Sequence, residues 1–107
     1  MVQPIPLTAV PNQVEAVALE GQSFILQINQ RSNGLYMDVF MNGAAIILGV
    51  LCENENLIIR NRYLGSPGDF FFYDTQGTSD PEYTGLGDRF RLIYVEESEI
   101  EAAVNGS

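Results

Sequence analysis

Five acidic side chains lie within one short stretch of the chain, and they have the composition of a cation site or a pair of catalytic acids. They are Asp69, Asp74, Asp80, Glu82 and Asp88. Carboxylates bind Ca²⁺, and two carboxylates can cleave a glycosidic bond. Their spacing does not match an EF-hand loop, and aspartates in turns commonly hydrogen-bond the backbone. We therefore expect structural aspartates here, with no metal and no cofactor.

The complete absence of histidine and lysine removes much of the ordinary chemistry of enzymes. Histidine is the usual general base, the commonest metal ligand and a member of most nucleophilic triads. A phosphate-cradling glycine loop needs a lysine, which this chain lacks. We therefore predict a protein that is not an enzyme.

The chain is strongly acidic, with a formal net charge of −9 from five arginines and fourteen Asp and Glu residues. A surface of this sign repels a phosphate backbone, so we expect no direct binding to nucleic acid. At 107 residues the chain is long enough for one modest core, and we expect a single domain.

Neither Cys52 nor the apolar segments indicate a secreted protein or a membrane-spanning segment. A lone cysteine has no disulfide partner, and the neighbouring Glu53 and Glu55 disfavour a reactive thiolate, so we interpret Cys52 as a structural thiol. The longest apolar stretch, residues 44–52, is far shorter than the about 20 residues of a membrane span. We expect no secretion signal and no membrane span.

Four of the five arginines occur as pairs separated by one residue: Arg60 with Arg62, and Arg89 with Arg91. In a strand, this spacing points both guanidinium groups to one side, where they suit the carboxylates of a partner. Pairing with the chain's own acids is the alternative for each arginine. We expect Arg89 and Arg91 to be structural and Arg60 and Arg62 to lie at the surface.

These charged residues are positioned by residues 69–94, whose pattern indicates strand, long loop and strand. Phe70 and Phe72 share one face of the first strand and Phe71 and Tyr73 the other, so both faces are apolar. Such a strand is typical of a sandwich or barrel interior, or of a face covered by a partner. In the return strand, the apolar residues Phe90, Leu92 and Tyr94 alternate with Arg89, Arg91 and Ile93.

The loop between these strands has the residues of a shaped connection. Asp80-Pro81 opens a turn, because proline fixes its own φ and restricts the residue before it. Gly77, Gly85 and Gly87 supply conformations that side chains with a Cβ reach only at a cost. We therefore expect a structural loop built on Asp74, Gly77, Asp80, Pro81, Gly85, Gly87 and Arg89.

The rest of the chain predicts further strands at 14–19, 24–29, 35–41, 44–51 and 57–60. Asn42-Gly43 predicts a type I′ hairpin turn, and residues 44–51 form its partner strand, with a helix there as the alternative. Five to seven strands without helical periodicity predict an all-β fold: a small antiparallel β-sandwich or partly open β-barrel with an extended Pro-rich N-terminal arm. We expect the arm at 1–13, a single β domain at 14–95 and an acidic C-terminal tail at 96–107.

Motifs at the two ends of this region resemble a small protein family. They are the run from Ile5 to Gln13, Asp74-Thr75-Gln76-Gly77, Asp80-Pro81-Glu82-Tyr83, Leu86-Gly87, Arg89-Phe90, Leu92 and Tyr94. Together they are similar to the baseplate plug proteins of cyanophages and related contractile-tailed phages. The resemblance spans roughly residues 4–95, the middle matching in strand pattern alone, and Cys52 to Asn61 matches no motif of the family.

The resemblance implies a non-enzymatic structural subunit that plugs or completes the central hub of a contractile-tail baseplate. Its partners would be other baseplate and hub proteins in a symmetric multi-copy assembly, and its location the virion tail baseplate, assembled in the host cytoplasm. The apolar arm and the aromatic strand offer more apolar surface than a core of this size needs, so part of it would be buried between chains. The interface candidates are Ile5, Leu7, Val10, Arg60, Arg62, Phe71, Tyr73 and Tyr83.

A free-standing ligand-binding module, for instance for carbohydrate, is the alternative. It would use exposed aromatic side chains such as Tyr63, Tyr73 or Tyr83. A sugar site usually has a planar aromatic platform, and this chain has no tryptophan. The structural role is therefore the favoured hypothesis.

Overall fold

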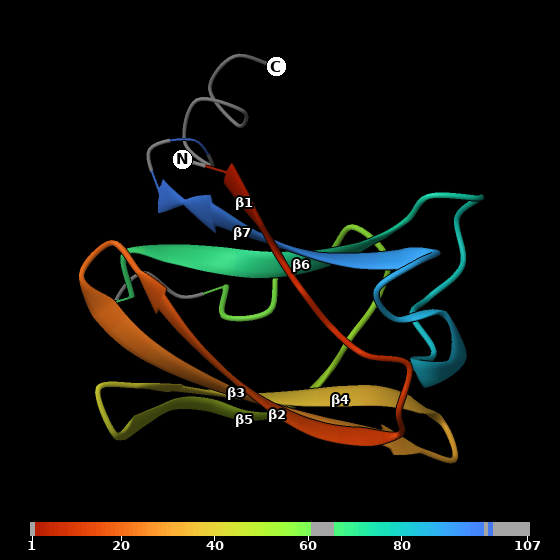
Figure 1. Cartoon of the computed structure of the whole chain (residues 1–107), viewed down its shortest axis with the longest axis horizontal. Coiled ribbons are helices and arrows are strands. Elements are labelled where there is room, and N and C mark those ends of the chain that lie inside the picture. The colour runs from red at the N-terminus through yellow and green to blue at the C-terminus, as the bar shows by residue number, and fades with distance from the viewer. Residues whose placement is uncertain (1, 61–65, 98, 100–107) are drawn as a thin grey trace.

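Two antiparallel sheets form the fold in the computed structural model, which describes residues 2–60, 66–97 and 99 (Figure 1). The three-stranded sheet has the order β1-β7-β6 and the four-stranded sheet the order β2-β3-β4-β5. The strands are β1 (Val2–Ile5), β2 (Asn12–Leu19), β3 (Gln22–Arg31), β4 (Gly34–Met41), β5 (Ala44–Leu51), β6 (Gly68–Asp74) and β7 (Phe90–Glu96). A 3-10 turn, η2 (Tyr83–Gly85), lies between β6 and β7. The predicted sandwich is confirmed, and the sheets do not close into a barrel.

The four-stranded sheet follows from local sequence patterns. Asn42 and Gly43 have φ of 52° and 84°, the two positive values of the predicted type I′ turn. Across this turn Met41 pairs with Ala44, so residues 44–51 form a strand and the helix alternative is wrong. In β3 and β4, every second side chain is buried, which is the period of a strand with one covered face.

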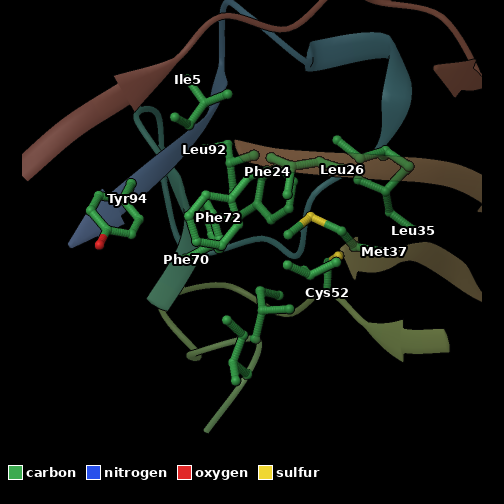
Figure 2. Packing of buried hydrophobic residues seen from close by; sticks show 14 of the residues in the cluster. Ile5, Phe24, Leu26, Leu35, Met37, Cys52, Phe70, Phe72, Leu92 and Tyr94 are labelled. Atoms are coloured by element: carbon green, nitrogen blue, oxygen red, sulfur yellow. The ribbon is translucent and has the colours of Figure 1, made fainter. Parts of the chain in front are cut away.

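The core lies between the two sheets (Figure 2). Phe70, Phe72, Leu92 and Tyr94 of the three-stranded sheet face Phe24 and its neighbours in the four-stranded sheet. The Phe24 and Phe70 rings meet edge to face with centroids 5.5 Å apart, a favoured aromatic geometry. Buried aromatic contacts of this kind fix how the two sheets stack.

The predicted N-terminal arm is wrong, because residues 2–5 are the edge strand β1 of the three-stranded sheet. Ile5 pairs with Leu92 and is buried, so the segment completes the chain's own sheet. Pro4 is tolerated there because an edge strand does not need every N–H for pairing. No helix in the described part of the chain is long and apolar enough to cross a membrane.

The strand predicted at 57–60 is also wrong. Leu57 makes a single bridge to Phe71, and the chain then bends. The buried carboxylate of Asp69 accepts the backbone N–H groups of Ile58 (3.1 Å), Ile59 (2.7 Å) and Arg60 (2.8 Å). The N–H groups of Ile59 and Arg60 are therefore satisfied by a side chain, whereas the Ile58 N–H is shared with the Phe70 carbonyl of β6. The predicted tail begins at Glu96, the last residue of β7, and residues 98 and 100–107 lie outside the described part.

Candidate protein-interaction surface

Asp74, at the end of β6, organises the loop that leads to β7. Its Oδ1 accepts hydrogen bonds from the Gln76 N–H and the Arg89 Nε, both at 2.8 Å. Its Oδ2 accepts from the Ser79 N–H at 2.9 Å and the Arg89 Nη2 at 2.8 Å. The Asp74 side chain is fully buried, and the Arg89 guanidinium lowers the pKa of this carboxyl well below its usual range. Asp74 is thus a structural anion with both oxygens occupied.

The same loop is tied to the segment that follows β5. The Asp80 carboxylate accepts the Asn54 N–H at 2.9 Å, and the Asn54 side-chain oxygen accepts the Asp74 N–H at 2.9 Å. Pro81, the next residue of the loop, is buried. Asp74 at the start of the loop and Asp80 in its middle therefore both hold it by accepting backbone hydrogen bonds.

Two of the three loop glycines are required by close packing. Gly87 has φ of +81°, and a Cβ there would also collide with the Leu7 carbonyl. A Cβ at Gly85 would lie 2.6 Å from the Phe90 ring, although the φ of Gly85 is ordinary. At Gly77 the nearest atom, Asp74 Oδ2, would be 3.3 Å away. A left-handed backbone explains the glycine at position 87 only.

The acidic stretch does not gather into a metal centre. Within residues 2–60 and 66–97, no three carboxylate or thiol side chains lie close enough together to hold an ion. Asp80, Glu82 and Asp88 line an open, polar pocket beside Arg89. Three of the five acids, Asp69, Asp74 and Asp80, point their oxygens at donors of their own chain.

The paired-arginine pattern does not place the guanidinium groups as two forks on strands. Arg89 precedes β7 and binds Asp74, whereas Arg91 lies on β7, is exposed and donates to the Asp88 carbonyl at 2.9 Å. Arg60 has φ of +63°, is exposed and donates to the Leu57 carbonyl at 2.6 Å. Arg62 and Tyr63 lie outside the described residues.

The apolar interface candidates are divided between the core and the surface. Ile5 is buried in the core, and Leu7 and Tyr83 are half-buried against it. Val10 is 37 % exposed. Phe71 and Tyr73 are half-buried and lie on the side of β6 opposite Phe70 and Phe72.

The four-stranded sheet presents a second apolar surface, which the sequence reasoning did not select. We call it the outer face: the side of β2, β3, β4 and β5 that points away from the core. The strand pairing aligns one apolar row across all four strands, from Ala16 through Ile25 and Phe40 to Ala45. Ile25 and Phe40 are only half-buried. The sequence did contain a signal for this face. In β3 and β4 the residues that alternate with the core-facing ones must point outward, and Ile25 and Phe40 are among them.

The outer face is nearly free of uncompensated charge across β2, β3 and β4. Asp38 accepts the Gly49 N–H at 2.6 Å. The Arg31 guanidinium stacks over the Tyr36 ring, 4.9 Å from its centroid. Both charged groups are thus engaged within the sheet. The neighbouring row, Val14 with Gln27 and Asp38, contains polar residues. The apolar row from Ala16 to Ala45, half-buried at its centre, is therefore the part of the outer face that indicates a contact surface.

Comparison with known proteins gives one assignment. No curated protein matches the chain. The model of the family described as "Cyanophage baseplate Pam3 plug gp18" matches residues 2–97, which include every described strand. The chain therefore belongs to this family of phage baseplate plug proteins.

Proposed function

We propose that the chain plugs or completes the central hub of a contractile-tail baseplate through protein–protein contacts. Membership of a baseplate plug family implies a structural role in the baseplate of the virion. The finer role, closing the hub by contact with neighbouring subunits, is supported by the outer face of the four-stranded sheet. A structural subunit needs such a surface, and no catalytic group is required of it.

The size of the outer face fits one contact in a larger assembly. Four strands of about eight residues cover on the order of 500 Å², from the spacing of strands and the rise per residue. A stable interface of standard size buries about 800 Å² on each partner. The outer face alone would therefore bind weakly, and firm incorporation would need further contacts elsewhere on the same subunit.

The arrangement of the tyrosines does not favour the carbohydrate-binding alternative. Tyr73 lies on the side of β6 that faces away from the core. Tyr83 packs against the core, and its N–H donates to the Gln30 side chain at 3.0 Å. Two aromatic rings placed on different parts of the sandwich do not form one flat platform for a sugar.

The experiment is co-expression of the tagged chain with the hub and tube proteins of its own phage, followed by co-purification. The test variant combines Ile25→Thr with Phe40→Ser, which removes the central apolar pair of the outer face. Gln27→Thr is the matched control, because Gln27 lies on the same face of the same strand and is polar. We expect the double variant to fold by circular dichroism and to lose at least tenfold in co-purified hub protein.

Two results would contradict the proposal. One is a wild-type chain that recovers no hub or tube protein under any co-expression condition. The other is a double variant that folds and co-purifies as well as Gln27→Thr. The first result would exclude a role in baseplate assembly. The second would show that the contact with the hub lies on another surface than the outer face.

A further inference from the structure

Strand β5 is unusual because every residue in it is apolar and none is buried. Its sequence is Ala-Ala-Ile-Ile-Leu-Gly-Val-Leu, yet all eight residues are exposed or half-buried. Ile46, Ile47 and Val50 reach the margin of the core without being covered by it. Leu48 is 60 % exposed. The apolar side chains of this edge strand are therefore not covered by the rest of the sandwich.

The other three sheet edges carry features that discourage further pairing. β1 has four residues and contains Pro4. The free side of β6 is covered by the segment after β5, since the Glu55 and Ile58 N–H groups donate to the carbonyls of Phe72 and Phe70. β2 places Glu15 opposite the buried Leu26, so a charge points inward along that edge.

Edge strand β5 has neither a charge nor a proline. Its pairing with β4 is irregular in two places, between Met37 and Val39 and between Val39 and Phe40. Bulges twist an edge strand and interrupt a regular ladder. A segment docking here would accordingly gain more from side-chain contact than from a long run of backbone hydrogen bonds.

We infer that β5 is a docking edge for an extended apolar segment of a neighbouring baseplate protein. The inference rests on the proposed function and adds a site and a partner chemistry to it. The segment would be uncharged along Ile46 to Leu51 and basic at one end, because Glu53 and Glu55 directly follow the strand. A second copy of this chain is a poorer occupant, since two chains of net charge −9 repel each other as they approach.

The test is a single charge placed on this edge, with a matched charge on an edge strand of the other sheet. Leu48→Lys is the test variant and Val2→Lys the control, because both residues are 60 % exposed and lie on edge strands, β5 and β1. Lysine on an edge strand is the residue by which natural proteins discourage pairing. We expect Leu48→Lys to lower co-purification with the hub and tube proteins at least tenfold, and Val2→Lys less than twofold.

A labelling experiment follows the same edge in a second way. Burial raises the pKa of Cys52 to about 12, so this thiol does not compete for a maleimide at neutral pH. Leu48→Cys then supplies one reactive thiol. It should label rapidly in the free chain and at least tenfold more slowly in the purified complex.

The outcomes separate the inference from the proposed function. Equal co-purification of the two lysine variants, or a Leu48→Cys thiol that labels equally fast in the complex, would overturn the inference alone. A homodimer of the isolated chain that Leu48→Lys abolishes would overturn the choice of partner. A wild-type chain that recovers no baseplate protein would overturn the proposed function, and the inference with it.

Discussion

Asp74 closes the loop between β6 and β7 by accepting hydrogen bonds on both carboxylate oxygens. Asp74→Asn would replace one oxygen by an NH₂ group that faces donors. Donors that face a buried carboxylate would lose their acceptor, so we expect the melting temperature to fall by roughly 5–10 °C. Thermal unfolding followed by circular dichroism measures this. The exposed Asp88→Asn should shift it by about 1 °C or less, and equal shifts in the two variants would contradict the prediction.

The same carboxylate should make the folded chain less stable as the pH falls. Arg89 lowers the pKa of Asp74 in the folded chain below the about 4 of an unfolded aspartate. The ionised form is thus favoured by folding, and its contribution is complete above about pH 5 and is lost as pH falls towards the folded pKa. The urea midpoint of the wild type should fall more steeply between pH 5 and pH 2 than that of Asp74→Asn. Parallel curves would show that Asp74 is not the group responsible.

Gly87 tests whether the loop depends on a left-handed residue in close contact. A side chain at positive φ costs about 1–2 kcal/mol, and at Gly87 the new Cβ would also meet the Leu7 carbonyl. Gly21 has a similar φ of +77° with nothing within 4 Å, so Gly21→Ala isolates the backbone cost. We expect Gly87→Ala to lower the free energy of unfolding by about 2–4 kcal/mol and Gly21→Ala by about 1 kcal/mol. Urea titrations would reveal the difference, and equal losses would count against the contact with Leu7.

At the scale of elements, strands specified by neighbouring residues could be predicted from the sequence. The Asn42-Gly43 turn sets the pairing of β4 with β5, and alternation alone defines β3 and β4. The extended backbone of β1 could be predicted from its prolines, but its pairing could not, because the partner strand β7 lies more than 80 residues away along the sequence. The segment 57–60 looked like a strand because no local signal reveals that Asp69 takes its N–H groups.

The candidate site was predictable to the same degree. The loop aspartates and Gly87 were identified from turn chemistry, which is local. The partner of Arg89 could not be read from the spacing of the arginines, because Arg89 precedes the strand that this reasoning assumed it was part of. The apolar row of the outer face could not be predicted, because each of its four residues comes from a different strand and their alignment depends on the strand pairing.

Strand β6 offers a comparison between two adjacent phenylalanines on opposite faces. Phe72 is fully buried in the core, whereas Phe71 is half-buried on the outward side. Phe72→Ser should lower the free energy of unfolding by about 3–5 kcal/mol, and Phe71→Ser by about 1 kcal/mol. If Phe71 contacts a neighbouring subunit, Phe71→Ser should still reduce co-purification with hub protein. Normal assembly of a folded Phe71→Ser chain would exclude this contact.

At the scale of the whole molecule, a strongly acidic chain carries apolar surfaces that are almost free of net charge. The chain has a radius of gyration of 13.1 Å and a net charge of −9. At 0.01 M salt the screening length is about 30 Å, so two copies repel each other across their full width. At 1 M salt it is about 3 Å, and apolar surfaces can then approach with little repulsion. Charge therefore keeps unassembled copies apart.

This charge distribution predicts that salt changes self-association more than it changes stability. Raising NaCl from 0.01 M to 1 M should increase the weight-average mass in sedimentation equilibrium, because screening removes the repulsion between apolar surfaces that tend to associate. The melting temperature should rise by only a few degrees, since the Asp74 carboxylate is buried and its pair with Arg89 is screened less than pairs of fully exposed charges. A melting temperature that rises by more than about 10 °C while the mass stays monomeric would show that the acidic surface opposes folding itself rather than association.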